Sequence, residues 1–287
     1  MKMHADEVDT SVSLVRELID SQYPQWTGLP ISRVAAGGTE HALYRLGDDL
    51  VVRMPFVATG AGQAKRDLAL LPRIAPHVPL AVPVPLALGE PALGYPFTWS
   101  VYPWLPGTNA TTASADPHTL AEFVLALQRI DTADGPAVNG RGGPLAPRAP
   151  YVRAALAQPD GVIDTAAAWS AWQRSLAAPE WDRPPVWLHG DLHAANLLVH
   201  EGRLSAVIDW GCVAVGDPAV DLLPAWGLLS VEARPVFRSS LDVDDATWER
   251  GRGWALSIGL IALPYYATTN PVLAGIARQM IDAVLAG

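Results

Sequence analysis

Polar side chains interrupt an apolar stretch at residues 186–199, VWLHGDLHAANLLV, where a short buried strand is expected at each end. A further apolar segment begins at Leu204 and runs into the tetrapeptide IDWG. Asp191, Asn196 and Asp209 therefore lie at the ends of neighbouring short strands. Carboxylate and amide oxygens suit Mg²⁺, and a lone carboxylate can accept a proton from a hydroxyl. The arrangement predicts a phosphoryl-transfer site in which Asp191 holds the acceptor hydroxyl and Asn196 and Asp209 hold the metal ions.

Each of these residues has a structural alternative when it is considered alone. An aspartate before a strand is often a turn or capping residue, and a single histidine such as His189 more often satisfies hydrogen bonds than performs chemistry. The ordered set is more specific. H-G-D-x-x-x-x-N, followed by a strand and I-D-W-G, is close to the H-R-D-x-x-x-x-N and D-F-G pair of protein kinases. A protein kinase itself is disfavoured, because neither an A-P-E segment nor a long activation segment follows Asp209.

Residues 1–101 have the pattern of a small sheet with helices. Val8, Val12, Val15 and Leu18 share one face at helical spacing, which predicts a first helix. Two short apolar runs flank the turn sequence Gly-Asp-Asp and predict an antiparallel hairpin. The expected helices are residues 8–21 and 62–74, and the expected strands are residues 31–36, 42–46, 50–54, 82–88 and 97–102.

The composition changes at residues 102–107, YPWLPG, where two prolines and a glycine predict a stiff connector. The chain beyond it reads as mostly helical. Asp116 is a predicted N-cap, Asp217 is expected to cap a helix, and Asp244 lies near the start of another helix. The sequence therefore predicts an α+β fold with two lobes, in which a small antiparallel sheet precedes a mostly helical C-terminal lobe. The predicted parts are an N-lobe at 1–101, a hinge at 102–107 and a C-lobe with the catalytic loop and acceptor site at 108–287. Within the C-lobe we expect helices at 116–130 and 164–177 and an exposed loop at 133–150.

The bulk properties fit a globular protein in a reducing compartment. The 287 residues suit one domain of two lobes, and the formal net charge of -9 argues against a general nucleic-acid surface. The one cysteine, Cys212, excludes an intrachain disulfide and is expected to be a packing residue. The N-terminus lacks the apolar segment of a signal peptide, and the longest apolar run is too short to span a bilayer. We expect a cytoplasmic monomer or weak dimer without nucleic-acid or membrane partners.

The chain resembles the aminoglycoside phosphotransferase family, also called the phosphotransferase enzyme family, which has a protein-kinase-like fold. The resemblance extends over most of the chain, and its specific parts are LHGDLHAANLL and VIDWGCVAVGDPAVDL. It implies that Asp191 is the catalytic base and that Asn196 and Asp209 are metal ligands. It also implies that His189 braces the loop and that His193 meets the γ-phosphate or the acceptor. The implied cofactors are ATP, with GTP as an alternative, and Mg²⁺.

The resemblance also assigns a phosphate-covering loop. Gly37 and Gly38 lie where the family has this loop, and backbone amides beside glycine can approach phosphate closely. The alternative is an ordinary turn, because a glycine pair alone is a weak signal. The family often has asparagine where this chain has His41.

Further nucleotide contacts follow from the resemblance. Arg53 lies at the strand position that kinases fill with lysine, and arginine can bridge phosphate oxygens bidentately. Asp67 is its expected acidic partner on the next helix, where glutamate is usual, and Lys65 is the nearby alternative cation. The adenine edge is expected to meet the carbonyl of Pro103 and the amide of Leu105, because proline lacks an N–H but keeps its carbonyl.

The acceptor is less closely defined by the sequence. The resemblance implies an antibiotic or a similar natural product with a free hydroxyl, and an aminoglycoside is the leading class. A site for a polycation needs several carboxylates, and the C-terminal part holds an acidic set that could line one. The alternative is that these residues form a solvated helix start. An aromatic set in the same part either shapes a pocket for a more apolar acceptor, such as a macrolide, or fills the core. The acidic set is Glu232, Asp242, Asp244, Asp245 and Glu249, and the aromatic set is Trp226, Trp248, Trp254, Tyr265 and Tyr266.

Two further functions stay open at this point. One is a metabolic kinase of the same fold that acts on a sugar, a choline-like molecule or an amino-alcohol. The other is a non-enzymatic, degenerate kinase module, which we rank last because Asp191, Asn196 and Asp209 are all present.

Overall fold

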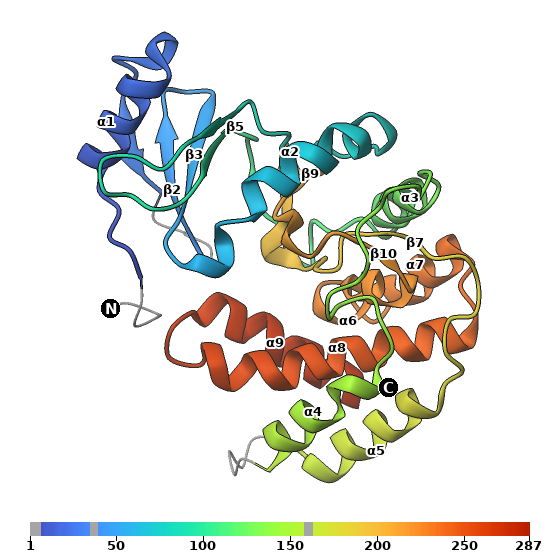
Figure 1. Ribbon diagram of the computed structural model, residues 1–287. Coiled ribbons are helices and arrows are strands. Elements are labelled where there is room, and N and C mark those ends of the chain that lie inside the picture. The colour runs from blue at the N-terminus through green and yellow to red at the C-terminus, as the bar shows by residue number, and fades with distance from the viewer. Residues whose placement is uncertain (1–6, 35–39, 158–162) are drawn as a thin grey trace. The chain divides into compact units, whose positions relative to one another are not determined.

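The computed structural model describes residues 7–34, 40–157 and 163–287. The chain divides into two compact units (Figure 1). The N-terminal unit comprises Met1–Pro76 and Ala81–Pro106, and the C-terminal unit comprises His77–Leu80 and Gly107–Gly287. An antiparallel sheet forms the centre of the first unit and helices dominate the second, so the predicted α+β fold is confirmed.

The sheet of the N-terminal unit has five antiparallel strands in the order β1-β2-β3-β5-β4. The predicted hairpin is present, because β2 and β3 pair directly with Leu46 opposite Leu50. The expected strand at 82–88 is mostly absent, since Pro83 and Pro85 have no N–H for a ladder and β4 begins only at Ala87. The strands are β1 (Ile31–Arg33), β2 (His41–Leu46), β3 (Leu50–Pro55), β4 (Ala87–Gly89) and β5 (Trp99–Pro103).

Two helices cover this sheet on opposite faces. Helix α1 (Val12–Gln22) starts four residues later than expected, because the Ser11 side chain caps it by accepting a hydrogen bond from the Leu14 amide. Its buried face joins a cluster with Val52 and other sheet residues. Successive residues of a strand face opposite sides, so Arg53 points to the other face, where helix α2 (Gln63–Ile74) packs.

The C-terminal unit contains two small sheets. Strands β6 (Thr108–Asn109), β8 (Leu197–His200) and β9 (Arg203–Val207) form one sheet in the order β6-β8-β9. Strand β7 (Val186–Leu188) pairs with β10 (Ala214–Gly216) in the other. The strands expected on both sides of the HGD sequence are therefore present, and the loop between them carries Asp191 and Asn196.

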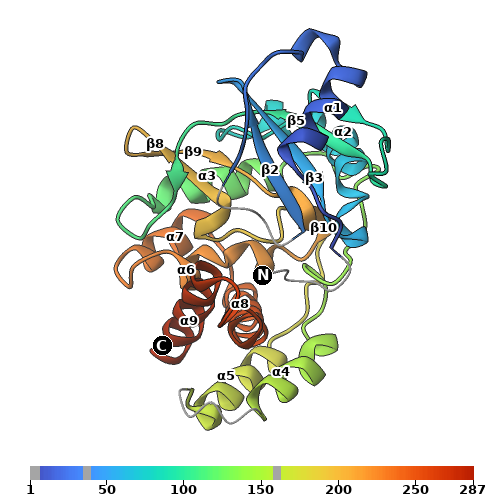
Figure 2. The ribbon, with the colours of Figure 1, turned by 90° about the vertical axis from the view of Figure 1, so that its left-hand side faces the viewer.

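Helices make up the remainder of the C-terminal unit. The predicted N-cap at Asp116 is confirmed, and so is the position of Asp244, which caps α8 through the Thr247 amide. Figures 1 and 2 both show α8 and α9 side by side, and α4 beside α5. None of the helices in the described residues is both long enough and apolar enough to cross a membrane. The helices are α3 (Pro117–Gln128), α4 (Ala149–Leu156), α5 (Thr165–Ala177), α6 (Pro224–Gly227), α7 (Ala233–Leu241), α8 (Asp245–Tyr266) and α9 (Pro271–Leu285).

The expectation of an exposed loop at 133–150 is wrong for part of that segment. It contains a 3-10 turn, η4 (Ala146–Arg148), and the start of α4. Leu145 is buried, and Gly142 lies so close to Leu188 that a side chain there would overlap it. Glycine and proline gave the segment the composition of a solvated loop, but here they permit close packing against β7.

Two glycines of the α8–α9 pair give the first prediction. A Cβ on Gly259 would lie 2.8 Å from the Ala277 carbonyl oxygen, whereas a Cβ on Gly275 meets nothing within 4 Å. Gly259→Ala should lower the free energy of unfolding by about 1–3 kcal/mol, because the helices must separate. Gly275→Ala should raise it by up to about 1 kcal/mol through helix propensity. Urea unfolding of both variants measures this, and equal stabilisation by the two would contradict the close helix contact.

Candidate active site

The β8–β9 hairpin determines where Asn196 and Asp209 lie. Leu197 pairs with Val207, and the Ile208 amide donates to the Asn196 carbonyl oxygen at 2.9 Å, so both residues lie at the same end of the hairpin. Asp209 has a left-handed backbone with φ of 59°, a conformation that aspartate adopts more readily than most residues. The hairpin register therefore brings together two side chains that are thirteen positions apart in the sequence.

Asp191 and Asn196 contact each other directly. The Asn196 Nδ2 donates to the Asp191 carbonyl oxygen at 3.0 Å and lies 3.4 Å from the Asp191 carboxylate. The amide nitrogen of Asn196 thus faces the loop, which turns its Oδ1 away from Asp191. Gly190, with φ of 79°, precedes the aspartate, and a Cβ there would lie 2.7 Å from the Cys212 carbonyl oxygen. Only glycine fits this backbone conformation and this approach.

His189 links the Asp191 loop to the end of β9. Its Nδ1 accepts from the Asp191 amide at 3.2 Å, and its Nε2 lies 3.1 Å from the Ile208 carbonyl oxygen. A neutral imidazole protonated on Nε2 satisfies both hydrogen bonds at once. Burial lowers the pKa of His189 to about 4, and the ring packs edge-on against Trp210. The histidine is therefore neutral near pH 7 and bridges the segments that carry Asp191 and Asp209.

A second buried carboxylate, Asp221, holds the same loop from the other side. Its two oxygens accept from the amides of His189 at 2.8 Å and Gly190 at 2.7 Å. Burial raises the pKa of Asp221 to about 7, while these two amide hydrogen bonds act in the opposite direction. The sequence analysis assigned no role to Asp221, although it closes the motif GDPAVDL and its position there was the available signal.

Arg141 is the second residue that the sequence analysis missed. Its guanidinium donates to the Asp191 carboxylate and, at 3.1 Å, to the Gly190 carbonyl oxygen. His193 lies on the other side, with its Nε2 3.5 Å from the same carboxylate. Burial alone would favour the neutral acid, but Arg141 and then His193 hold the pKa of Asp191 well below its usual range. Arg141 stands fifty residues before Asp191 in a Gly/Pro-rich segment, and no local pattern marks it.

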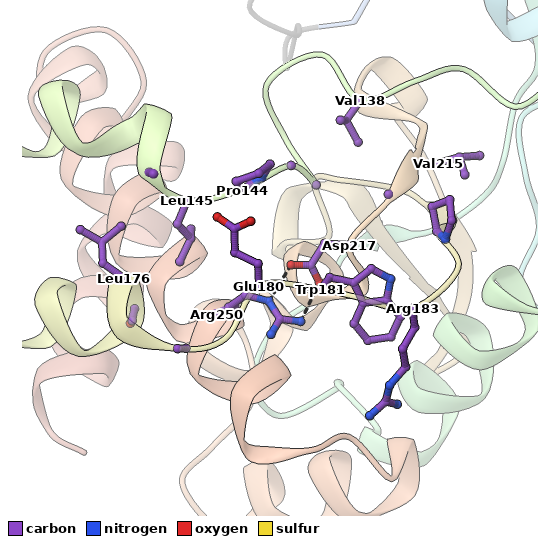
Figure 3. A pocket seen from close by; sticks show the side chains of 17 residues that line it. Val138, Pro144, Leu145, Leu176, Glu180, Trp181, Arg183, Val215, Asp217 and Arg250 are labelled. Carbon is purple, nitrogen blue, oxygen red and sulfur yellow. Dashed lines mark hydrogen bonds and ion pairs between the residues drawn. The ribbon is translucent and has the colours of Figure 1, made fainter.

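Asp217 caps the segment that follows the site, as the sequence predicts. It accepts from the Ala219 amide at the start of the 3-10 helix η7 (Pro218–Leu222). It also forms a buried, two-pronged ion pair with Arg250 of α8, at 2.7 and 3.1 Å. A cavity of about 350 Å³ lies beside this pair, lined by residues such as Leu145, Glu180 and Trp181 (Figure 3).

The nucleotide-binding residues expected in the N-terminal unit fall into two groups. Gly37 and Gly38 lie outside the described residues. Arg53 and Asp67 form the expected pair, with Nη1 and Oδ2 3.7 Å apart. Asp67 also accepts from the Tyr102 hydroxyl at 2.9 Å, and Arg53 donates to Gln63 at 3.2 Å. The shorter aspartate therefore reaches the arginine across the sheet face.

His41 and the connector complete this unit. His41 is buried as the first residue of β2, where Gly60 leaves room for its ring. Pro103 ends β5 and Leu105 is half-buried in the segment that follows. Between them, the Trp104 amide donates to the Asp49 carbonyl oxygen at 2.7 Å. This hydrogen bond fixes the backbone on which the Pro103 carbonyl and the Leu105 amide lie.

The donor set of the C-terminal unit fits Mg²⁺ better than a transition metal. Within residues 7–34, 40–157 and 163–287, no three His, Cys, Asp or Glu side chains converge on a possible metal position. Asn196 and Asp209 supply one amide and one carboxylate oxygen at the same hairpin end. Mg²⁺ typically binds one or two protein oxygens and takes its remaining ligands from water and phosphate.

Three of the five acidic residues that were open to an acceptor site or a solvated helix start have partners elsewhere. Asp244 caps α8 and pairs with Arg183 at 2.7 Å, and Asp245 pairs with Arg238. Glu249 accepts from the Ser175 hydroxyl at 2.8 Å. In the aromatic set, Trp226 and Trp254 are buried in the core, Tyr265 is exposed, and Trp248 and Tyr266 lie between these extremes.

One family model matches most of the chain. The model of the phosphotransferase enzyme family matches residues 32–254. The uncharacterised protein YcbJ of Bacillus subtilis is 27% identical over 157 residues, which cover 51% of this chain and 49% of that protein. The chain thus spans about half the length of this curated relative.

Solved structures show the same fold. The GDP and kanamycin complex of APH(2")-IIia superposes with a TM-score of 0.74 at 17% identity, over 96% of this chain and 99% of that one. The macrolide 2'-phosphotransferase MphH from Brachybacterium faecium superposes with a TM-score of 0.59 at 23% identity, over 94% and 97% of the two chains. The predicted kinase-like fold with an antiparallel-sheet N-terminal part is therefore confirmed.

The environment of His189 predicts an unusual titration. Its ordinary pKa is 6.5, and burial lowers it to about 4, so protonation opposes folding. The resulting stabilisation is complete above pH 6.5 and is lost as the pH falls toward 4, by roughly 3 kcal/mol in total. Nitrogen-detected NMR of the imidazole should show the neutral Nε2–H form at pH 6. A midpoint near 6.5 would contradict the bridging role.

The two ion pairs of α8 make a matched comparison. Arg250 and Asp217 are 5% and 8% exposed, whereas Arg183 and Asp244 are 61% and 40% exposed. Arg250→Met should lower the free energy of unfolding by about 3–5 kcal/mol, because Asp217 is left buried without its partner. Arg183→Met should cost less than about 1 kcal/mol. Chemical unfolding gives both values, and similar losses would contradict the role assigned to Asp217.

Proposed function

The chain belongs to the phosphotransferase enzyme family, and we propose that it moves the γ-phosphoryl group of ATP, or alternatively GTP, to a hydroxyl of a small molecule. The observation that supports this most directly is the contact between Asp191 and Asn196 beside the end of β9, where Asp209 lies. Phosphoryl transfer needs a carboxylate for the acceptor hydroxyl and oxygen ligands for a metal ion at neighbouring positions. We expect the enzyme to act in the cytoplasm.

In this proposal Asp191 acts as an ionised carboxylate throughout the approach of the acceptor. Because its pKa lies well below the usual range, it is a weak base and does not deprotonate a free alcohol. It orients the hydroxyl by accepting its hydrogen bond. As the new P–O bond forms, the bond from the γ-phosphorus to the bridging oxygen breaks, the hydroxyl becomes acidic and its proton passes to Asp191. Positioning and electrostatics then supply most of the rate.

Asn196 and Asp209 are assigned to Mg²⁺ in the proposal. When bound there, the ion would neutralise charge that develops on the phosphate oxygens. The nucleotide contacts are assigned to Gly37, Gly38 and Arg53 by the resemblance, with Asp67 orienting Arg53. His193 lies near the Asp191 carboxylate, and we assign it a contact with the γ-phosphate or the acceptor.

Membership of the family is compatible with several classes of acceptor. The names of the relatives include kanamycin and macrolide, which supports natural-product antibiotics as acceptors, with an aminoglycoside as the class that the sequence favoured. A metabolic acceptor, such as a sugar or an amino-alcohol, is the alternative. Against an aminoglycoside stands the observation that Asp244, Asp245 and Glu249 already serve as a helix cap and as hydrogen-bond or ion-pair partners.

Substitution of the acceptor-binding carboxylate tests the mechanism. Asp191→Asn should lower kcat by about 10²–10⁴-fold, because an amide cannot accept the proton, while nucleotide binding is retained. Asp209→Ala should weaken binding of the Mg²⁺–nucleotide complex as well. Coupled ADP release and nucleotide titration measure the two effects.

The control is Asp182→Asn, which changes an exposed carboxylate in the same unit. It should behave as the unsubstituted chain does. Full activity of Asp191→Asn would exclude Asp191 as the base, and loss of nucleotide binding in that variant would assign it to the nucleotide instead.

A further inference from the structure

The segment before α4 brings positive charge to the surroundings of Asp191, which also contain the carboxylates of Asp209 and Asp221. Two arginines lie seven positions apart in the segment before α4, and Arg141 contacts Asp191 directly. Arg148 ends η4, and its Nε donates to the buried hydroxyl of Ser257 on α8. Its guanidinium carbon lies 5.0 Å from the ring centroid of Trp254. Both arginines thus project toward groups of the catalytic loop and α8.

Arg148 has no acidic partner. No carboxylate in the described part of the chain lies within ion-pair distance of it. One hydroxyl and one indole face do not balance a guanidinium charge. A partly buried cation without a counter-charge is unfavourable, and such a residue is more readily retained where an anion can approach.

The two guanidinium groups also act on each other. Burial lowers the pKa of Arg148 to about 10, and the positive charge of Arg141 lowers it further in the same direction. The pKa of Arg141 is raised by Asp191 against the effect of burial. Arg141 therefore interacts both with the Asp191 carboxylate and with the Arg148 guanidinium. The other groups that act on them are Cys212 and Tyr266 for Arg141 and Tyr151 for Arg148.

We propose that Arg141 and Arg148 bind an anionic group of the acceptor, a carboxylate or a phosphate, and so select a hydroxy acid or a phosphorylated alcohol as substrate. This inference rests on the proposed function and specifies its acceptor class. The planar guanidinium fork matches both anions and binds them through paired N–H donors. Arg141 contacts Asp191 as well, so an anion on Arg141 brings the same molecule's hydroxyl within reach of the catalytic carboxylate.

This assignment replaces the aminoglycoside as the acceptor class. The ammonium groups of an aminoglycoside would be repelled by Arg141 and Arg148. Three of the five carboxylates considered for such a site, Asp244, Asp245 and Glu249, already cap α8 or bond to other side chains. A hydroxy acid would be attracted instead of repelled, because its carboxylate supplies the counter-charge that Arg148 lacks.

The anion that Arg141 and Arg148 bind could also be the γ-phosphate of the nucleotide. One binding experiment distinguishes the γ-phosphate from an anionic group of the acceptor. The protein, saturated with Mg²⁺ and a non-hydrolysable ATP analogue, is titrated with acetate, methylphosphonate and, separately, ethylenediammonium at constant ionic strength. The Nε–Hε signals of the arginines are followed by NMR. The signal of Arg148 should shift saturably with both anions and not with the diamine.

Two variants provide the controls. Arg148→Met keeps the length of the side chain, removes its charge and should abolish anion binding. Arg153→Met is its match, because Arg153 also lies over a tryptophan, Trp169, at 5.3 Å, but is exposed on α4. It should leave the anion titration unchanged.

The outcomes separate the possibilities. A shift with the diamine, or no shift with either anion, overturns the inference. A shift of Arg148 on nucleotide addition that blocks anion binding assigns the arginines to the γ-phosphate and also overturns it. Failure of the nucleotide analogue to bind at all counts against the proposed function itself.

Turnover gives an independent test of the acceptor class. The enzyme should release ADP faster with glycerate or glycerol 3-phosphate as the acceptor than with glyceramide, glycerol or kanamycin at equal concentration. Arg148→Met should raise the KM for the anionic acceptor by about tenfold or more. Arg148→Lys should raise this KM less, because lysine keeps the positive charge. A higher kcat/KM for kanamycin than for every anionic acceptor would overturn the inference.

Discussion

One buried imidazole joins the two segments on which the candidate active site depends. His189 accepts from the Asp191 amide and bonds to the Ile208 carbonyl oxygen, so the loop that holds the Asp191 carboxylate is connected to the segment after β9 that carries Asp209. Asp221 fixes the same loop through two backbone amides. Both side chains are fully buried. The side chains proposed to react are thereby positioned by residues to which the proposal assigns no chemical step.

Charge balance around Asp191 explains how a carboxylate can be both buried and reactive. Burial disfavours its charge, but Arg141 and His193 stabilise it strongly enough to keep it ionised. An ionised carboxylate of low basicity suits phosphoryl transfer, where the proton leaves late. The proposed anion site uses the same arginine together with Arg148. In that proposal, the group that keeps Asp191 charged also helps to select the acceptor.

Local pattern was sufficient for much of this structure. Local pattern predicted the strands around the HGD loop and the caps at Asp116 and Asp217, because each depends on a few neighbouring residues. The pairing of Arg53 with Asp67 was predicted from the family resemblance, and the structure shows it within one strand–helix unit. Arg141 was missed because its partner lies fifty residues away and its own segment has the composition of a solvated loop. The acidic set stayed open between an acceptor site and a solvated helix start, because composition shows charge but not its partners. Long-range pairing of side chains is the information that spacing does not contain.

The central claim is that this chain transfers a phosphoryl group to a hydroxyl. The most direct measurement is phosphorus NMR of the protein with Mg²⁺, ATP and a mixture of hydroxy acids, sugar alcohols, amino-alcohols, aminoglycosides and macrolides. The account predicts a new phosphate monoester signal that grows in step with ADP and carries an anionic group elsewhere in the product. Formation of inorganic phosphate alone, or no consumption of ATP despite nucleotide binding, would contradict it.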